Sequence, residues 1–140
     1  MRVMPFLLSA VLVLGGASPG AAATHAGDRA LPLLASPAWL AEHAGDPQIV
    51  LLHMAYTRRE YEREHIAGAR FLWFYDLVQQ TPEAMTDLPP RQQVESVLEK
   101  LGVGRDSRIV LCYDGNAFVG AARIFYTLDV YGLGERTALL

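Results

Sequence analysis

The chain has 140 residues, of which 51% are hydrophobic, and a formal net charge of −3 at pH 7. This length suits one domain with a single hydrophobic core. The mildly acidic balance excludes the basic surface with which proteins usually hold nucleic acids or acidic membranes. The single cysteine, Cys112, excludes an intrachain disulfide. We therefore expect a domain stabilised by its core, with no nucleic-acid partner.

The first residues have the order of a secretory signal peptide. Arg2 precedes an apolar run over residues 6–14, a Gly-Gly break follows, and three alanines end the segment at Ala23. A bilayer-spanning helix needs about 20 apolar residues, so this run is too short to be an anchor. The sequence predicts a signal peptide over residues 1–23, export to a periplasm, and no membrane partner after removal. Residues 24–32 predict a flexible mature N-terminus, followed by a domain over residues 33–140.

The first half of that domain predicts helices and strands in alternation. Ser36 and Pro37 are typical of an N-cap and a first helical position, and they open a helix predicted to end near Gly45. An apolar run predicts a buried strand over residues 49–53. A densely charged segment then predicts a short exposed helix over residues 57–65, and an aromatic stretch predicts a strand over residues 71–74.

The second half repeats this alternation. A loop rich in proline precedes apolar residues at helical spacing over residues 94–101, a strand over residues 108–113 and an apolar helix over residues 117–131. The pattern predicts an α/β domain with a parallel sheet flanked by helices. The last residues, 137–140, predict the opening of another strand. A parallel strand at this point would leave backbone N–H and C=O groups on its outer edge without partners. We therefore expect a domain truncated at its last strand and incomplete at its C-terminus.

The loop after Tyr113 is the predicted site. Ligands of open α/β sheets bind beyond the carboxyl ends of the strands, and a loop that enters a helix directs backbone N–H groups at an anion. We call this loop the anion cradle. Arg123 follows in an apolar helix, where it could pair with Asp114 or neighbouring carbonyls, or extend to solvent. The candidate substrate-binding residues are Asp114, Gly115, Asn116, Ala117, Phe118 and Arg123.

Several stretches, taken together and in this order, resemble the rhodanese-type sulfurtransferase family. They are SPAWL at residues 36–40, IVLL at 49–52, YEREHIAGARF at 61–71, LEKLGV at 98–103, RIVLCYDG at 108–115 and AAR at 121–123. The resemblance implies a five-stranded α/β fold. It also implies a catalytic cysteine at the end of the strand, which takes sulfur from a donor such as thiosulfate as a persulfide and passes it to an acceptor.

Asp114 stands at the position of that cysteine, and a carboxylate cannot form a persulfide. The chain is therefore similar to the non-catalytic amino-terminal copy of tandem members. The resemblance implies a second rhodanese domain and small sulfur anions as partners, and no cofactor. A stand-alone binding module of the same fold is the alternative, and a nonfunctional remnant is a third interpretation.

Cys112 is the other candidate nucleophile. It shares a strand face with Asp114 but lies deeper in the sheet, so we expect it to be buried and inert, unless a shifted loop register brings it within reach. His65 lies in the family's turn motif, which predicts a structural role. His53 stands where the family usually has an aspartate.

The remaining candidates have ordinary structural interpretations. Arg58, Arg59 and Arg63 interleave with glutamates, which favours a solvated helix face over contacts with a substrate anion. The aromatic stretch over residues 71–75 suits either a domain interface or the core. No histidine pair has metal-ligand spacing, so we expect no metal site.

Overall fold

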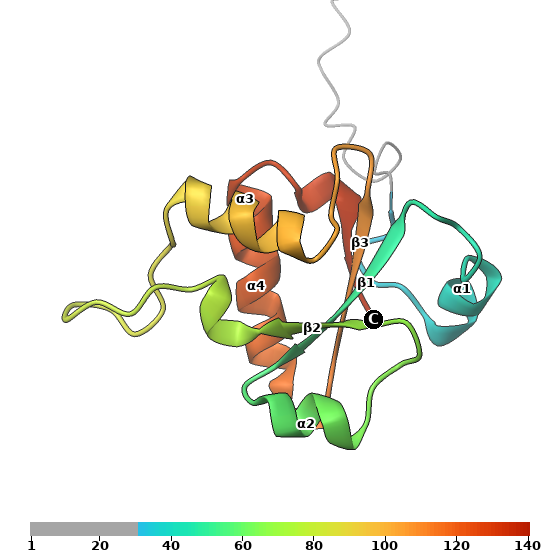
Figure 1. Ribbon diagram of the computed structural model, residues 1–140, viewed down its shortest axis with the longest axis horizontal. Helices are drawn as coiled ribbons and strands as arrows, with labels where there is room; N and C mark the ends of the chain where they lie inside the picture. The colour runs from blue at the N-terminus through green and yellow to red at the C-terminus, as the bar shows by residue number, and fades with distance from the viewer. Residues whose placement is uncertain (1–30) are drawn as a thin grey trace, which may run out of the picture.

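The computed structural model describes residues 31–140, and the predicted signal peptide lies outside the described residues. Figure 1 shows the arrangement of the elements. The helices are α1 (Pro37–Glu42), α2 (Arg58–Arg63), α3 (Arg91–Lys100) and α4 (Phe118–Val130), with 3-10 turns η1 (Phe74–Asp76), η2 (Gly115–Ala117) and η3 (Gly134–Arg136). The strands are β1 (Ile49–Ala55), β2 (Arg70–Trp73), β3 (Arg108–Tyr113) and β4 (Thr137–Leu139). No helix of the described part is long and apolar enough to cross a membrane.

The strands form one parallel sheet in the order β2-β1-β3-β4. The predicted α/β fold, a parallel sheet flanked by helices, is confirmed. In the register of β1 and β3, His53 lies opposite Cys112 and Met54 lies opposite Tyr113. The carboxyl ends of the two central strands, β1 and β3, therefore lie side by side, next to the loop that carries Asp114.

The two faces of the sheet are covered unequally. Alternate residues of β1 and β3, such as Leu52 and Leu111, pack against α3 and α4 in the larger core. The opposite face carries a smaller cluster around Val110 and Ala138, with α1 beside it (Figure 1). Helix α1 has no buried residue, so it covers this second face only in part.

Leu31 belongs to the ordered domain. It was predicted to lie in the flexible N-terminus, but it is buried in the smaller cluster beside Ala35. The apolar side chain of Leu31 explains the difference, because it contributes buried area to a face that has little other cover.

The outer edge of β4 has a partner that the sequence argument did not foresee. Leu34 forms a parallel bridge with Leu139. The N–H of Ala35 donates to the carbonyl of Leu139 (2.7 Å), and the N–H of Leu139 donates to the carbonyl of Leu33 (2.9 Å). The expectation of open ladder groups is therefore wrong at Leu139. The sheet of the described residues has four strands, with this bridge at the outer edge of β4, where the resemblance implied five strands.

Local sequence explains where α1 and α2 begin. The side chain of Ser36 accepts a hydrogen bond from the N–H of Trp39, and Pro37 occupies the first turn of α1. Thr57 and Glu60 form a capping box at the start of α2. This box fixes the end of β1 relative to α2, and so places the charged face of α2 beside the carboxyl ends of the strands.

Candidate active-site loop

A cavity of about 390 Å³ lies beside the predicted loop. Four of the predicted residues line it, namely Asp114, Gly115, Asn116 and Ala117. The facing wall comes from the end of β1 and from α2, and includes Tyr56 and Arg63. A Cβ atom added at Gly115 would meet nothing within 4 Å, so the loop borders open space.

The carboxylate of Asp114 is turned toward α2 and β1. Its Oδ2 atom accepts a hydrogen bond from Nη2 of Arg63 at 3.1 Å, and its Oδ1 atom lies 3.8 Å from Nε2 of His53. It makes no side-chain cap to η2. The carboxylate of Asp114 therefore does not cap the backbone N–H groups at the start of η2.

The ion pair between Arg63 and Asp114 lies at the surface, because their side chains are 69% and 38% exposed. Pairs of this kind contribute about 0.2–1 kcal/mol, because water screens the charges and both side chains lose freedom. Sequence reasoning assigned Arg63 to a solvated helix face. Its exposure agrees with that, but its pairing with Asp114 was missed.

His53 is the buried polar group of the site, with 3% of its surface exposed. Neither of its ring nitrogens has a hydrogen-bond partner. Its ring lies edge-on to Tyr61, with 5.6 Å between the centroids. Burial lowers the pKa of His53 below its ordinary 6.5, Asp114 and Glu60 oppose that shift, and His65 adds to it. The imidazole is therefore neutral at pH 7.

Cys112 is buried, which confirms that part of its interpretation. Its thiol donates to the carbonyl of Leu52, with 3.5 Å between sulfur and oxygen. Burial raises the pKa of the thiol to about 12, and the charge of Asp114 adds to this effect. Since the thiolate is the nucleophile, Cys112 has almost none of the reactive form at neutral pH.

Arg123 and Phe118 do not line the cavity. The guanidinium of Arg123 donates to the carbonyl of Thr86 from Nη2 (2.7 Å) and to Oγ1 of Thr127 from Nη1 (2.6 Å). Its grouping with the cradle is thus corrected, because it ties the loop before α3 to α4. The ring of Phe118 is half exposed and contacts the ring of Tyr113.

His65 supports the turn between α2 and β2. Its Nδ1 atom lies 2.8 Å from the carbonyl oxygen of Tyr61, and the two rings stack. The hydroxyl of Tyr61 donates to the carbonyl of Ala69 across the turn (2.8 Å). Gly68 has a φ of 84°, a conformation that favours glycine. These contacts agree with the predicted structural role of His65.

The aromatic stretch divides between core and surface. Phe74 is buried, whereas Trp73 and Tyr75 are partly exposed. The indole N–H of Trp73 donates to the carbonyl of Tyr56 at 2.9 Å. Among residues 31–140, no group of three or more histidine, cysteine or acidic side chains could hold a metal ion.

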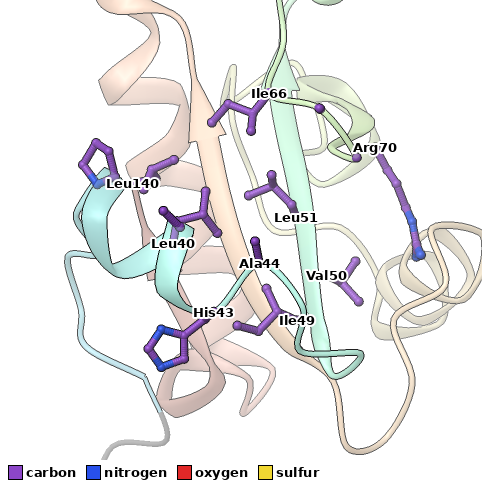
Figure 2. A pocket seen from close by; sticks show the side chains of 13 residues that line it. Leu40, His43, Ala44, Ile49, Val50, Leu51, Ile66, Arg70 and Leu140 are labelled. Atoms are coloured by element: carbon purple, nitrogen blue, oxygen red, sulfur yellow. The ribbon is translucent and has the colours of Figure 1, made fainter.

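A second cavity, of about 440 Å³, lies over the thinly covered face of the sheet (Figure 2). Its labelled lining includes Leu40, Ile49, Leu51, Ile66 and Leu140. His43 and Arg70 are its titratable lining residues. The rest of the lining is mostly apolar.

Fold and site together define a parallel α/β domain with a cavity-lining loop at the carboxyl ends of its central strands. The family model of the Rhodanese-like domain matches residues 36–138, and the chain belongs to that family. It is 34% identical over 102 residues to a thiosulfate sulfurtransferase of Azotobacter vinelandii, covering 73% of this chain and 37% of that protein. It is 31% identical over 109 residues to a putative thiosulfate sulfurtransferase of Mycobacterium tuberculosis, covering 77% and 38%.

A solved structure has the same fold. It is the 3-mercaptopyruvate sulfotransferase SseA from Escherichia coli, with a TM-score of 0.61 and 16% identity. The match covers 78% of this chain and 40% of that one. The chain thus spans less than half the length of the relatives that it matches.

Proposed function

We propose that this chain is the non-catalytic rhodanese domain of an exported thiosulfate-type sulfurtransferase. The proposal rests on Asp114, which the resemblance aligns with the nucleophilic cysteine of the family's loop. A carboxylate oxygen cannot accept and release a sulfur atom as a thiolate does. The loop and its cavity thus belong to a rhodanese site that lacks its nucleophile.

The buried thiol supports this proposal. Cys112 is the one cysteine of the chain, and it would have to attack a sulfur donor from inside the sheet. A pKa of about 12 and the contact with Leu52 oppose that step. Sulfur transfer is therefore assigned to a second domain, for which the relatives have room, since 37% and 38% of their lengths are matched.

The role that we propose for this domain is support of the catalytic one. Trp73 and Tyr75 expose aromatic surface at the edge of the sheet that β2 forms. Aromatic residues are enriched in the buried parts of protein interfaces. This edge is the proposed contact with the second domain.

The test is an assay of thiocyanate formation from thiosulfate and cyanide with the purified 140-residue chain. We expect no turnover above the rate without protein, and the same result for Cys112→Ser. Turnover in the wild type that disappears in Cys112→Ser would overturn the proposal, because the thiol would then be the nucleophile.

Export is tested separately. After expression in a bacterium, we expect the chain in the periplasmic fraction with Thr24 as its first residue, since the signal peptide is predicted to end at Ala23. Deletion of residues 6–14 is the control and should leave the chain in the cytoplasm. Full-length chain in the cytoplasm, starting at Met1, contradicts this part of the proposal.

The alternative proposal is a stand-alone binding module. The open cavity beside Asp114 favours it, because a loop without a nucleophile can still bind a ligand. The two proposals differ in one observable: only the first requires a second rhodanese domain with a cysteine in its loop, acting with this one.

A further inference from the structure

Asp114 lies between the exposed guanidinium of Arg63 and the buried imidazole of His53. We propose that it pairs with Arg63 while His53 is neutral and turns to His53 once that ring is protonated. The released Arg63 guanidinium then binds a small oxyanion in the cavity beside the loop. This inference rests on the proposed function and deepens it, because the resemblance already implies small sulfur anions at this loop, and the exchange of partners would make their binding depend on pH.

The geometry allows the exchange with a small movement. One oxygen of Asp114 is 3.1 Å from Nη2 of Arg63, and the other is 3.8 Å from Nε2 of His53. The second distance is just beyond hydrogen-bond range. The carboxylate makes no cap to η2 that would hold it in place. A rotation of this side chain can therefore close the gap to His53 and open the gap to Arg63.

The buried ring of His53 explains why Asp114 would exchange partners. Its ring nitrogens are buried without a hydrogen-bond partner, and a buried polar group without a partner is costly. A protonated imidazole donates from both nitrogens and needs a negative acceptor more strongly than a neutral ring does. Protonation thus moves the preference of Asp114 from the exposed guanidinium to the buried ring.

Of the two carboxylates near His53, Asp114 is the one that can change its partner when the ring is protonated. The charged and titratable groups around His53 are Asp114 in the loop, Glu60 and Tyr61 on α2, His65 after α2, and Cys112 opposite it on β3. An oxygen of Glu60 accepts hydrogen bonds from the N–H groups of Tyr56 and Thr57, each at 3.0 Å. Glu60 is therefore held in its capping box.

The consequence for the cavity is a change in charge. With Asp114 paired to Arg63, a carboxylate stands beside the space next to Gly115 and repels anions. With Asp114 turned to His53, the guanidinium faces that space without its partner. Guanidinium groups bind oxyanions through two parallel hydrogen bonds. The cavity beside Arg63 should therefore bind a small oxyanion more tightly in acid.

Sulfate is the probe, titrated into the 140-residue chain at pH 7.5 and pH 5.0 with constant ionic strength. Binding is followed by the NMR shifts of the Gly115 and Asn116 amides. We expect the wild type to bind sulfate about fivefold more tightly at pH 5.0, the factor that corresponds to the loss of a surface ion pair. Asp114→Asn should bind tightly at both pH values, and Arg63→Gln weakly at both.

Two matched variants control for charge and for other histidines. Arg59→Gln removes a charge from the same helix outside the cavity, and His65→Gln removes the neighbouring imidazole. Both should keep the pH dependence of the wild type, whereas His53→Gln should lose it. The proposal is overturned if wild-type affinity is the same at both pH values, or if the pH dependence survives in His53→Gln.

A direct measurement covers the case in which His53→Gln does not fold. The side-chain N–H signal of Arg63 and the ring signals of His53 are recorded in the wild type from pH 7.5 to pH 4.5. The two should change with the same midpoint. An Arg63 signal that stays constant while His53 titrates refutes the exchange of partners.

Discussion

Replacement of Asp114 by cysteine would place a thiol on the cavity that the native chain leaves without one. At pH 8 an ordinary cysteine, with a pKa of about 8.5, has about a quarter of its thiol ionised. The pKa of Cys112 is about 12, so about one molecule in ten thousand carries its thiolate at that pH. Alkylation rates follow the thiolate population. We therefore expect the new thiol to react about two thousandfold faster than Cys112.

The assay is alkylation with iodoacetamide at pH 8, with peptide mass spectrometry to separate the two sites. Burial of Cys112 slows its reaction further, whereas Asp114 is 38% exposed and Arg63 stands beside it to stabilise a thiolate. Asp114→Ser is the control for the loss of the carboxylate. Native Cys112 that reacts within about tenfold of a free cysteine would refute the reasoning, because that rate requires an accessible, ionised thiol.

Four further predictions concern stability, measured by urea unfolding. A double-mutant cycle on Arg63 and Asp114 should give a coupling of about 0.2–1 kcal/mol that shrinks in 1 M salt, and a coupling that salt leaves unchanged would contradict an exposed pair. Leu111→Ala, in the centre of the larger core, should cost about 2–5 kcal/mol. Met85→Ala, at a side chain 79% exposed, should change stability by less than about 0.5 kcal/mol. The lowered pKa of His53 means that the unfolded state binds its proton first, so stability should fall as pH drops through 6.5, and His53→Gln should reduce that fall.

The local pattern of apolar and turn-forming residues was sufficient to predict the main strands and helices of the fold. The strand over Arg108–Tyr113 was predicted to the residue, because an unbroken apolar run ends at turn-forming Asp114 and Gly115. The helix after it was predicted within one residue at each end. These elements are determined by neighbours in sequence, which is the information that a single chain provides.

The pairing at the site could not be predicted in the same way. Arg63 and Asp114 are 51 residues apart in sequence, and nothing in the charge pattern of α2 distinguishes Arg63 from Arg58 or Arg59. Arg123 was misplaced for a related reason. The sequence suggested Asp114, a neighbouring carbonyl or solvent as its partner. The guanidinium instead donates to the carbonyl of Thr86, 37 residues away in an irregular loop, and local sequence patterns do not predict such a contact.

The bridge between Leu34 and Leu139 has a consequence for the order of folding. It joins segments from opposite ends of the described chain, so it closes the longest loop of the sheet and can form only when β4 is already in place against β3. We expect it to form last and to open first, with the amide of Leu139 exchanging with solvent well before those of β1. Each such opening exposes the unpaired edge of β4 to other molecules. The few residues before α1 thus protect the domain from sheet-to-sheet association.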